Sequence, residues 1–410
     1  MYINKIEIEN FRTFRKSHID FIHPQQDFKG LGLPIPRLRN VNLLLGNNGL
    51  GKTTLLKAIS LAALGPAVRS SGIYAYRLVR REPNTSESAS VARIEAEFIP
   101  HDQDQVDYSR IESRLEIVRK GDLEELQWTH PEEKRWHPIF STSSDAFFFV
   151  GYGATRRVEK RDQVDIGSRR SNSFVRAQRV QSLFEEAYSL LPLNSWLPQF
   201  QHENPGRYKQ VITLISRLMG EGHYEFTGEM EEGEYVFNRS GLKVPFTALS
   251  DGYRAFIGWV GDLLYHVCMT ASKGEMLWGN KGIVMVDEID LHLHPKWQMT
   301  ILQTLSEALP NIQFIVTSHS PLIVGSLEWM NIIVMLPEPG EASETQRIEW
   351  AVHGLDADQV LLTDFFGMES TRAPGKKRRL KELSLRARDG DTEAAKTLLT
   401  EMSGGTEVEL

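Results

Sequence analysis

The chain has 410 residues, of which 41% are hydrophobic and 25% are charged, a composition typical of globular proteins that work in water. Its net charge of −7 excludes a general attraction to nucleic acid or anionic membrane, so any such contact must be local. Cys268 is the only cysteine, which excludes an internal disulfide and a cysteine-based metal cluster. No apolar run approaches the roughly 20 residues that span a bilayer, and the N-terminus lacks an apolar secretion signal. We therefore expect a cytoplasmic protein without a membrane partner.

The N-terminal part of the chain predicts mostly strands. Alternating apolar and polar residues are typical of a half-buried strand, and short continuous apolar runs are typical of a buried one. A helix is predicted at about 51–64, where Gly65-Pro66 would end it. On these patterns we expect strands at 2–9, 18–22, 41–46, 91–99, 111–118, 123–128 and 143–153.

In the remainder of the chain, segments with helical periodicity alternate with apolar runs. This alternation predicts an α/β fold with a mainly parallel sheet and right-handed crossovers, to which the N-terminal segments add antiparallel strands. We expect helices at 174–191, 207–219, 251–271 and 296–309, and strands at 223–227, 234–238, 282–287, 312–317, 331–336 and 347–352.

Residues 46–53 match the phosphate-binding pattern G-x-x-x-x-G-K-[ST] at every defined position. The loop lies between an apolar strand and a helix, so its backbone N–H groups and the helix dipole would both face an anion. Lys52 would reach the β- and γ-phosphates of ATP, and the Thr53 hydroxyl would bind Mg²⁺. The expected ATP-binding residues are Gly46, Asn47, Asn48, Gly49, Leu50, Gly51, Lys52, Thr53 and Thr54.

Two further strand ends carry groups suited to ATP hydrolysis. The run Gly282-Ile283-Val284-Met285-Val286 is followed by Asp287, which would hold Mg²⁺, and by Glu288, which would activate the attacking water as general base. His319 follows the next apolar strand, at the edge where open α/β sheets bind ligands. As a neutral imidazole it would hydrogen-bond the γ-phosphate or the water. The alternative for Asp287 and Glu288 is that they only cap the strand, and the alternative for His319 is a structural role.

A second anion-binding pattern, Ala248-Leu249-Ser250-Asp251-Gly252, opens the helix predicted from 251. A single P-loop would need no second cradle in its own subunit. A Ser-x-Gly at a distant helix start therefore suits a site that faces another protomer. The alternative is an ordinary helix cap.

Taken in order, the P-loop, LSDG, VMVDEID, LHLHP and TSHSP resemble the ABC-type ATPase head of the SMC, Rad50 and RecF class. The resemblance covers about residues 1–340. It implies that two heads sandwich two ATP molecules, so that Ser250, Asp251 and Gly252 would bind the ATP of the opposite P-loop. Asp290, Leu291 and His292 would lie in the segment that crosses the dimer interface. The N-terminal NFRTF turn also fits this class, and Arg12 would approach the base or ribose of ATP.

One segment departs from the family pattern. Residues 151–157 (GYGATRR) stand where the family has its Q-loop, but no glutamine is present at the expected point, only Tyr152, Gly153 and Arg156. A Mg²⁺-binding role for this loop is therefore not expected.

The chain between Lys52 and Asp287 is too short for a long coiled coil and lacks heptads, which favours a compact arm. The LHLHP and TSHSP elements look closest to OLD-like AAA ATPases of bacterial anti-phage systems, and the tail is similar to that of Septu-type and retron-associated ATPases. We expect an N-terminal ATPase lobe (1–155), an inserted, mainly helical arm (156–240), a C-terminal ATPase lobe (241–354) and a helical tail (355–410). The tail would dock a partner or, alternatively, only complete the core.

The expected function is that of an ATP-hydrolysing switch with slow, regulatory turnover and with ATP and Mg²⁺ as cofactors. It would form homodimers or higher even-numbered oligomers and regulate a partner nuclease of HNH or TOPRIM type in trans, because the short tail leaves no room for a nuclease domain in this chain. The alternatives are a RecF-like repair ATPase, the ATP-hydrolysing subunit of an ABC transporter, and a scaffold without DNA contact. Residues 156–181 hold eight Arg or Lys against three Asp or Glu. This run is either a double-stranded DNA contact, through Arg169, Arg170, Arg176 and Arg179, or a solvated loop.

Overall fold

A computed structural model describes residues 1–82, 89–140, 146–158, 175–220, 224–271, 274–340 and 342–402. The chain divides into two compact units, Met1–Gly354 and Leu355–Leu410. The division falls at the residue where the sequence predicts the tail to begin, and the other domain boundaries stay predictions. Within the described ranges, no helix is long and apolar enough to cross a membrane.

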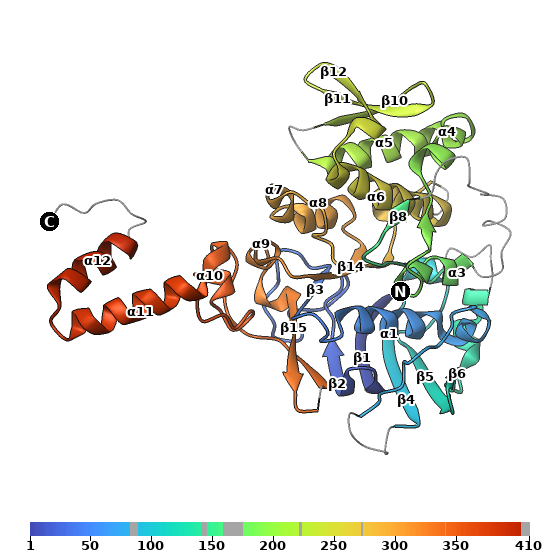
Figure 1. Ribbon diagram of the computed structural model, residues 1–410. Helices are drawn as coiled ribbons and strands as arrows, with labels where there is room; N and C mark the ends of the chain where they lie inside the picture. The colour runs from blue at the N-terminus through green and yellow to red at the C-terminus, as the bar shows by residue number, and fades with distance from the viewer. Residues whose placement is uncertain are drawn as a thin grey trace. The chain divides into compact units, whose positions relative to one another are not determined.

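The main sheet of the larger unit has six strands in the order β16-β15-β3-β14-β13-β7. Figure 1 labels β3, β14 and β15 of this sheet. Neighbouring strands from β15 to β7 pair in parallel, and β16 pairs antiparallel with β15, which confirms the mainly parallel sheet. Every residue of β3, β13 and β14 is buried, as expected of strands that are mostly apolar and lie inside a parallel sheet. The strands are β3 (Val41–Leu45), β7 (Phe149–Tyr152), β13 (Gly282–Val286), β14 (Ile312–Ser318), β15 (Ile332–Glu338) and β16 (Ala342–Gln346).

A second, antiparallel sheet is formed by the N-terminal strands in the order β2-β1-β4-β5-β6. Helix α1 (Lys52–Leu64) contacts β4 and β5 of this sheet as well as β7 and β14 of the main sheet. Because both sides of α1 are covered, nearly all of its residues are buried and its sequence is apolar around the helix. The strands are β1 (Tyr2–Phe11), β2 (Phe14–Asp20), β4 (Val91–Ile99), β5 (Ile111–Lys120) and β6 (Leu123–Trp128).

Two helices within residues 193–219, α4 and α5, contact the long helix α6 (Asp251–Thr270). Helix α4 (Leu193–Glu203) was not predicted; it carries Pro198 inside it, where a proline normally interrupts a helix. Helix α5 (Pro205–Met219) contacts the first strand of a three-stranded antiparallel sheet. Its strands are β10 (Glu225–Glu231), β11 (Glu234–Arg239) and β12 (Leu242–Pro245).

The helix predicted at 174–191 is wrong. Only α3 (Val175–Gln178) is α-helical, and it is followed by the 3-10 turn η5 (Gln181–Leu183). Backbone hydrogen bonds run from Val180 N to Ala177 O (3.1 Å) and from Leu183 N to Val180 O (3.0 Å). The apolar spacing of three therefore reflects consecutive 3-10-type turns rather than an α-helix. A short parallel pair, β8 (Arg157–Val158) and β9 (Ser189–Leu190), brackets this region.

Three other expectations need correction. The strand predicted at 347–352 lies instead at β16, because the turn at Gly340 (φ 78°) brings the chain back directly after β15. The predicted helix 296–309 is two helices, α7 (Pro295–Gln298) and α8 (Ile301–Ala308). Of the strand predicted at 143–153, residues 149–152 form β7, and 141–145 lie outside the described residues.

The remaining elements are short, apart from two helices of the smaller unit that contact each other. They are η1 (Gly65–Ser70), η2 (Asp102–Asp104), η3 (Glu133–Phe140), η6 (Phe246–Ala248), η7 (Leu277–Gly279), α9 (Pro321–Gly325) and η8 (Trp329–Asn331) in the larger unit. The smaller unit holds α10 (Ala357–Leu361), α11 (Pro374–Arg388) and α12 (Thr392–Met402). The helical tail is therefore confirmed.

Candidate active site

Three of the predicted motifs meet at one edge of the main sheet. The P-loop follows β3, the two carboxylates follow β13, and His319 follows β14. These strands are parallel neighbours in the order β3-β14-β13, so their carboxyl ends lie together. This edge is where open α/β sheets bind their ligands.

The P-loop has a backbone shape that requires glycine. Gly49 and Gly51 have φ values of 85° and 96°, in the left-handed region that glycine adopts without strain. A Cβ at Gly51 would also overlap Thr13 in the turn between β1 and β2 and crowd the ring of Phe14 at the start of β2. The first turn of α1 contains no acidic residue, so the helix N-terminus retains its positive potential for an anion.

Lys52 is folded back into this loop. Its side chain is largely buried, and its Nζ donates hydrogen bonds to the carbonyl oxygens of Gly46 (2.7 Å) and Asn47 (3.2 Å). Burial is the main cause that lowers the pKa of Lys52, opposed by the charge of Asp287. Of the other expected P-loop residues, Asn47, Asn48 and Gly49 are exposed, Gly46, Leu50, Gly51 and Thr53 are half-buried, and Thr54 is buried.

Asp287 is held from both sides by threonines. Its Oδ2 accepts a hydrogen bond from Thr53 Oγ1 and its Oδ1 accepts one from Thr317 Oγ1, each at 2.7 Å. Thr317 Oγ1 in turn accepts a hydrogen bond from the backbone N–H of Glu288 at 2.7 Å. One carboxylate thus links the P-loop, β13 and β14, and it is only 4% exposed.

Arg156 fixes the backbone that carries the two acids. Its guanidinium donates to the carbonyl oxygens of Asp287 (3.0 Å) and Glu288 (2.9 Å) and is buried. Glu288 has φ 47°, a left-handed conformation that costs a non-glycine residue free energy unless its surroundings hold it. Burial lowers the pKa of Arg156 to about 10, which leaves it charged at pH 7. Arg156 is therefore a positioning residue for Glu288.

We expect Arg156→Met to separate positioning from nucleotide binding. The two carbonyl groups would lose a charged donor, so the free energy of unfolding should fall by about 1–3 kcal/mol. ATP affinity measured by calorimetry should change little, because the P-loop is untouched, whereas turnover should fall. Arg157→Met is the matched control, since that neighbouring arginine is exposed. Equal turnover in both variants would contradict the positioning role.

His319 faces the same cluster with a free ring nitrogen. Among the described residues, its Nε2 is buried and has no hydrogen-bond partner. Burial, and next the charge of Lys52, lower the pKa of His319, which favours the neutral imidazole. An unpartnered buried nitrogen beside Lys52 fits a phosphate oxygen or a water molecule held there.

The donors at this edge also fit Mg²⁺. The Thr53 hydroxyl and the Asp287 carboxylate are hard oxygen ligands 2.7 Å apart. Within the described ranges, no group of three or more His, Cys, Asp or Glu side chains could hold a metal by itself. A metal here would need phosphate and water oxygens as further ligands, which is how Mg²⁺ is commonly held with nucleotides.

The second predicted anion cradle lies at the start of α6. Ser250 is the exposed N-cap residue, and its side chain makes no capping hydrogen bond, which disfavours the ordinary helix cap. Asp251 is exposed and pairs with Arg254 of the same helix. A Cβ at Gly252 would overlap the carbonyl oxygen of His292, so glycine allows the close approach of these two segments.

The segment expected to cross the dimer interface follows the two acids. His292 is exposed and has φ 67°, whereas Leu291 and Asp290 are half-buried. The Oδ1 atom of Asp290 has no hydrogen-bond partner among the described residues. No described hydrogen bond or ion pair joins Ser250 to the P-loop of the same chain, so a role in trans stays a prediction.

Arg12 lies in the turn between β1 and β2, next to the residues that touch Gly51. Its φ is 49°, and its guanidinium donates to the carbonyl oxygen of Tyr76 at 3.5 Å. Burial is the main cause that lowers the pKa of Arg12. The turn therefore adjoins the P-loop, and contact with the base or ribose stays a prediction.

The candidate DNA-binding arginines divide into two groups. Arg169 and Arg170 lie outside the described residues. Arg176 is buried and donates to the backbone carbonyls of Ile139, Pro138 and Ala146, so the structure corrects its expected role from DNA contact to support of the core. Arg179 is half-buried, with its guanidinium 5.6 Å from the centre of the Phe148 ring.

Two site residues were missed from sequence. Arg156 was noted only as a departure from the Q-loop pattern and as part of a basic run. Thr317 begins the motif TSHSP, in which only His319 was predicted to have a role. The signal that could have identified Thr317 is its position near the end of the strand predicted at 312–317, which was expected to lie beside the strand that ends at Asp287.

The sequence of this chain is similar to a known protein family and to several known proteins. Residues 41–325 match the model of the family described as "AAA domain, putative AbiEii toxin, Type IV TA system". The Septu protein PtuA of Bacillus mycoides (strain KBAB4) is 28% identical over 378 residues, which are 90% of this chain and 45% of that protein. The Retron Vc95 probable ATPase of Vibrio cholerae serotype O1 biovar El Tor is 23% identical over 343 residues, 70% of this chain and 67% of that protein. The chain thus spans less than half of the Bacillus relative.

Solved structures show the same fold at low sequence identity. An SMC head bound to the C-winged helix domain of ScpA superposes with a TM-score of 0.51 at 17% identity, covering 85% of this chain and 98% of that one. An Smc head domain derived from Pyrococcus furiosus gives a TM-score of 0.50 at 14% identity, covering 85% and 96%. The predicted SMC-type head fold is therefore confirmed.

Proposed function

Because this chain belongs to the AAA-domain family that its residues 41–325 match, we propose that it is an ATP-hydrolysing switch of bacterial anti-phage defence. The observation that carries the proposal is the Asp287 carboxylate, which accepts hydrogen bonds from Thr53 of the P-loop and from Thr317 of β14. A P-loop threonine bonded to the acid at the end of a buried strand is the arrangement that binds a nucleotide with its metal ion. The similarity to Septu and retron proteins supports the defence role.

Each residue at this edge has a distinct task in hydrolysis. Lys52 would release its two loop carbonyls and bind the β- and γ-phosphates. Glu288, whose backbone is fixed at both its N–H and its carbonyl, would take a proton from the attacking water. His319 would hydrogen-bond the γ-phosphate through its unpartnered Nε2. Mg²⁺, held by Thr53 and Asp287, would neutralise charge that develops on the phosphates.

The active form in this proposal is a dimer of heads with ATP between them. Ser250 is exposed and its side chain makes no capping hydrogen bond, so its hydroxyl is available to a phosphate from outside its own chain. The order of the motifs, which resembles that of the ABC-type ATPase heads, supports this arrangement.

We further propose that the ATP-bound state regulates a partner nuclease in trans. The smaller unit carries α11, whose sequence PGKKRRLKELSLRAR is strongly basic and would suit an acidic partner surface. Double-stranded DNA is a further candidate partner through the basic run 156–181, without Arg176. HNH and TOPRIM nucleases are the partner classes to test first.

Lys52→Ala tests the nucleotide site directly. Loss of the ammonium should remove most of the affinity for ATP, as measured by isothermal titration calorimetry, together with ATP-dependent control of the partner. Lys57→Ala is the control, because it removes a lysine from the same helix that lies against Phe184 instead. Unchanged ATP affinity in Lys52→Ala would refute this assignment of the P-loop.

A further inference from the structure

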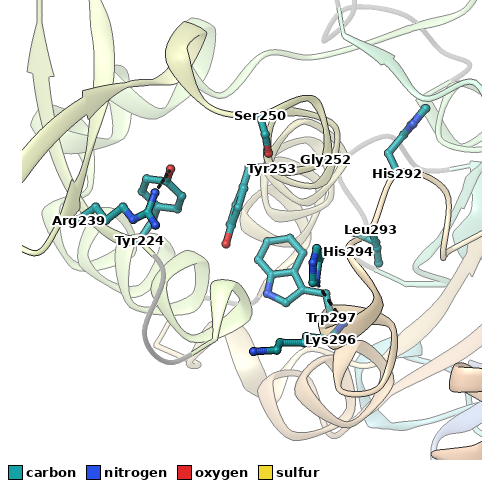
Figure 2. Close-up of a pocket in the computed structure, with 10 residues that line it drawn as sticks. All are labelled: Tyr224, Arg239, Ser250, Gly252, Tyr253, His292, Leu293, His294, Lys296 and Trp297. Carbon is teal, nitrogen blue, oxygen red and sulfur yellow. Dashed lines mark hydrogen bonds between the residues drawn. The ribbon is translucent and has the colours of Figure 1, made fainter. Parts of the chain in front are cut away.

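A cavity of about 740 Å³ opens beside Ser250 and Gly252, and its lining contains no residue of the P-loop (Figure 2). Its size falls within the range of about 300–1,000 Å³ that small-molecule sites occupy. It is therefore separate from the site at the sheet edge, although it adjoins the second anion cradle.

Three aromatic rings surround this cavity, from three separate parts of the chain. Tyr253 of α6 stands between Tyr224, which precedes β10, and Trp297 of α7. Its ring centre lies 4.8 Å from that of Tyr224 and 4.5 Å from that of Trp297, with interplanar angles of 79° and 70°. All three rings are half-buried, so each keeps some surface for a ligand. Such a group of rings suits a planar aromatic ligand.

The charge of the lining is of one sign. Among the residues that the structure describes, it includes Arg239 and Lys296 but no Asp or Glu, although the chain carries a net charge of −7. Both cationic side chains are exposed, and among the described residues neither forms an ion pair. The Arg239 guanidinium lies 5.5 Å from the centre of the Tyr224 ring. An anionic group would therefore find uncompensated positive charge next to the aromatic surface.

A second cavity of about 790 Å³ shows that aromatic rings and unbalanced positive charge do not occur together in every cavity of this protein. It also contains an arginine over a tyrosine, with Arg135 4.6 Å from the centre of the Tyr108 ring. However, Glu132 and Glu133 are in its lining, and Arg135 pairs with Glu132. Its positive charge is thus balanced within the protein.

We propose that the cavity beside Ser250 binds a nucleotide, either free or as one unit of a nucleic acid strand. The base would stack on Trp297 with its edge against Tyr253, and the phosphate would bind Arg239 and Lys296. Aromatic side chains accept any base by stacking, and arginine and lysine are the usual partners of phosphate. The site needs neither Lys52 nor ATP hydrolysis.

The test uses full-length Lys52→Ala protein, so that the P-loop contributes little to binding. The probes are adenosine monophosphate, which lacks the β- and γ-phosphates that Lys52 would bind, and a short single-stranded DNA oligonucleotide. We expect at least one probe to give saturable binding by calorimetry. Adding Trp297→Ala should weaken it about tenfold, the effect of losing one stacked ring, and Trp297→Phe should restore most of it. Adding Arg239→Ala together with Lys296→Ala should weaken binding and reduce its salt dependence.

Arg135→Ala is the matched control and should leave binding unchanged. Binding of the monophosphate alone would assign the site to a free nucleotide, and binding of the oligonucleotide alone would assign it to a strand. The proposal is overturned if neither probe binds, or if binding survives both the Trp297→Ala and the Arg239→Ala with Lys296→Ala changes. Because these measurements are made without a working P-loop, their failure would not bear on ATP hydrolysis at the sheet edge.

Discussion

Glu288→Gln is expected to bind ATP with normal affinity and to hydrolyse it slower by on the order of 10²–10⁴, the usual weight of a general base. Glutamine has the same shape but does not accept the proton of the attacking water. The backbone of residue 288 should be unaffected, because its N–H bonds Thr317 and its carbonyl bonds Arg156, and neither contact uses the side chain. The variant should therefore accumulate in the ATP-bound state.

The measurements are steady-state phosphate release, ATP affinity by calorimetry, and mass by light scattering with and without ATP. Glu307→Gln on α8 is the control, since this glutamate is exposed and contacts Gln303 of its own helix. If Glu288→Gln hydrolyses ATP at nearly the normal rate, another group is the base. His319 would not replace it readily, because burial and the charge of Lys52 lower its pKa and so make it a weak proton acceptor.

The parts of the site that could be predicted from sequence are those whose residues all lie within one short segment. The P-loop is such a case, because its glycines, Lys52 and Thr53 lie within eight residues, and the turn between strand and helix follows from them. The acids after β13 are another, since a buried parallel strand must end where its apolar run ends.

What the sequence did not show depends on contacts between distant segments. Arg156 looks like one more charge in a basic run, and only the fold brings it onto the Asp287 and Glu288 carbonyls. Thr317 acquires its role because β14 pairs with β13 in the register Val286 with Val316. The apolar spacing around Val180 fits an α-helix as well as 3-10 turns, and tertiary burial against β7 decides between them.

The second large expected effect concerns the composite site, in which the P-loop of one protomer and Ser250 of the other would bind the same ATP. Ser250→Arg should leave ATP binding at the P-loop of the same chain intact, because Lys52 and its loop are untouched. It should also fold normally, since Ser250 is exposed. ATP-linked dimerisation and hydrolysis should both fail, because the bulky cation would fill the space meant for the γ-phosphate of the opposite protomer.

Mixing this variant with Lys52→Ala separates a site in trans from a site in cis. In a heterodimer, the intact P-loop of the Ser250→Arg chain would face the intact Ser250 of the Lys52→Ala chain. The other composite site would carry both lesions. Two inactive proteins should therefore regain hydrolysis when mixed, measured as single-turnover phosphate release so that one intact site suffices.

The control replaces Lys52→Ala by a chain that carries both Lys52→Ala and Ser250→Arg. A heterodimer of this chain with Ser250→Arg has no intact composite site and should stay inactive. If Ser250 served the nucleotide of its own chain, each protomer of the first mixture would hold one lesion in its own site, and mixing would restore nothing. Absence of recovery, in a mixture that light scattering shows to contain dimers, would therefore assign Ser250 to its own subunit. The exposure of Ser250 favours recovery, because its side chain makes no capping hydrogen bond and its hydroxyl is available to a second chain.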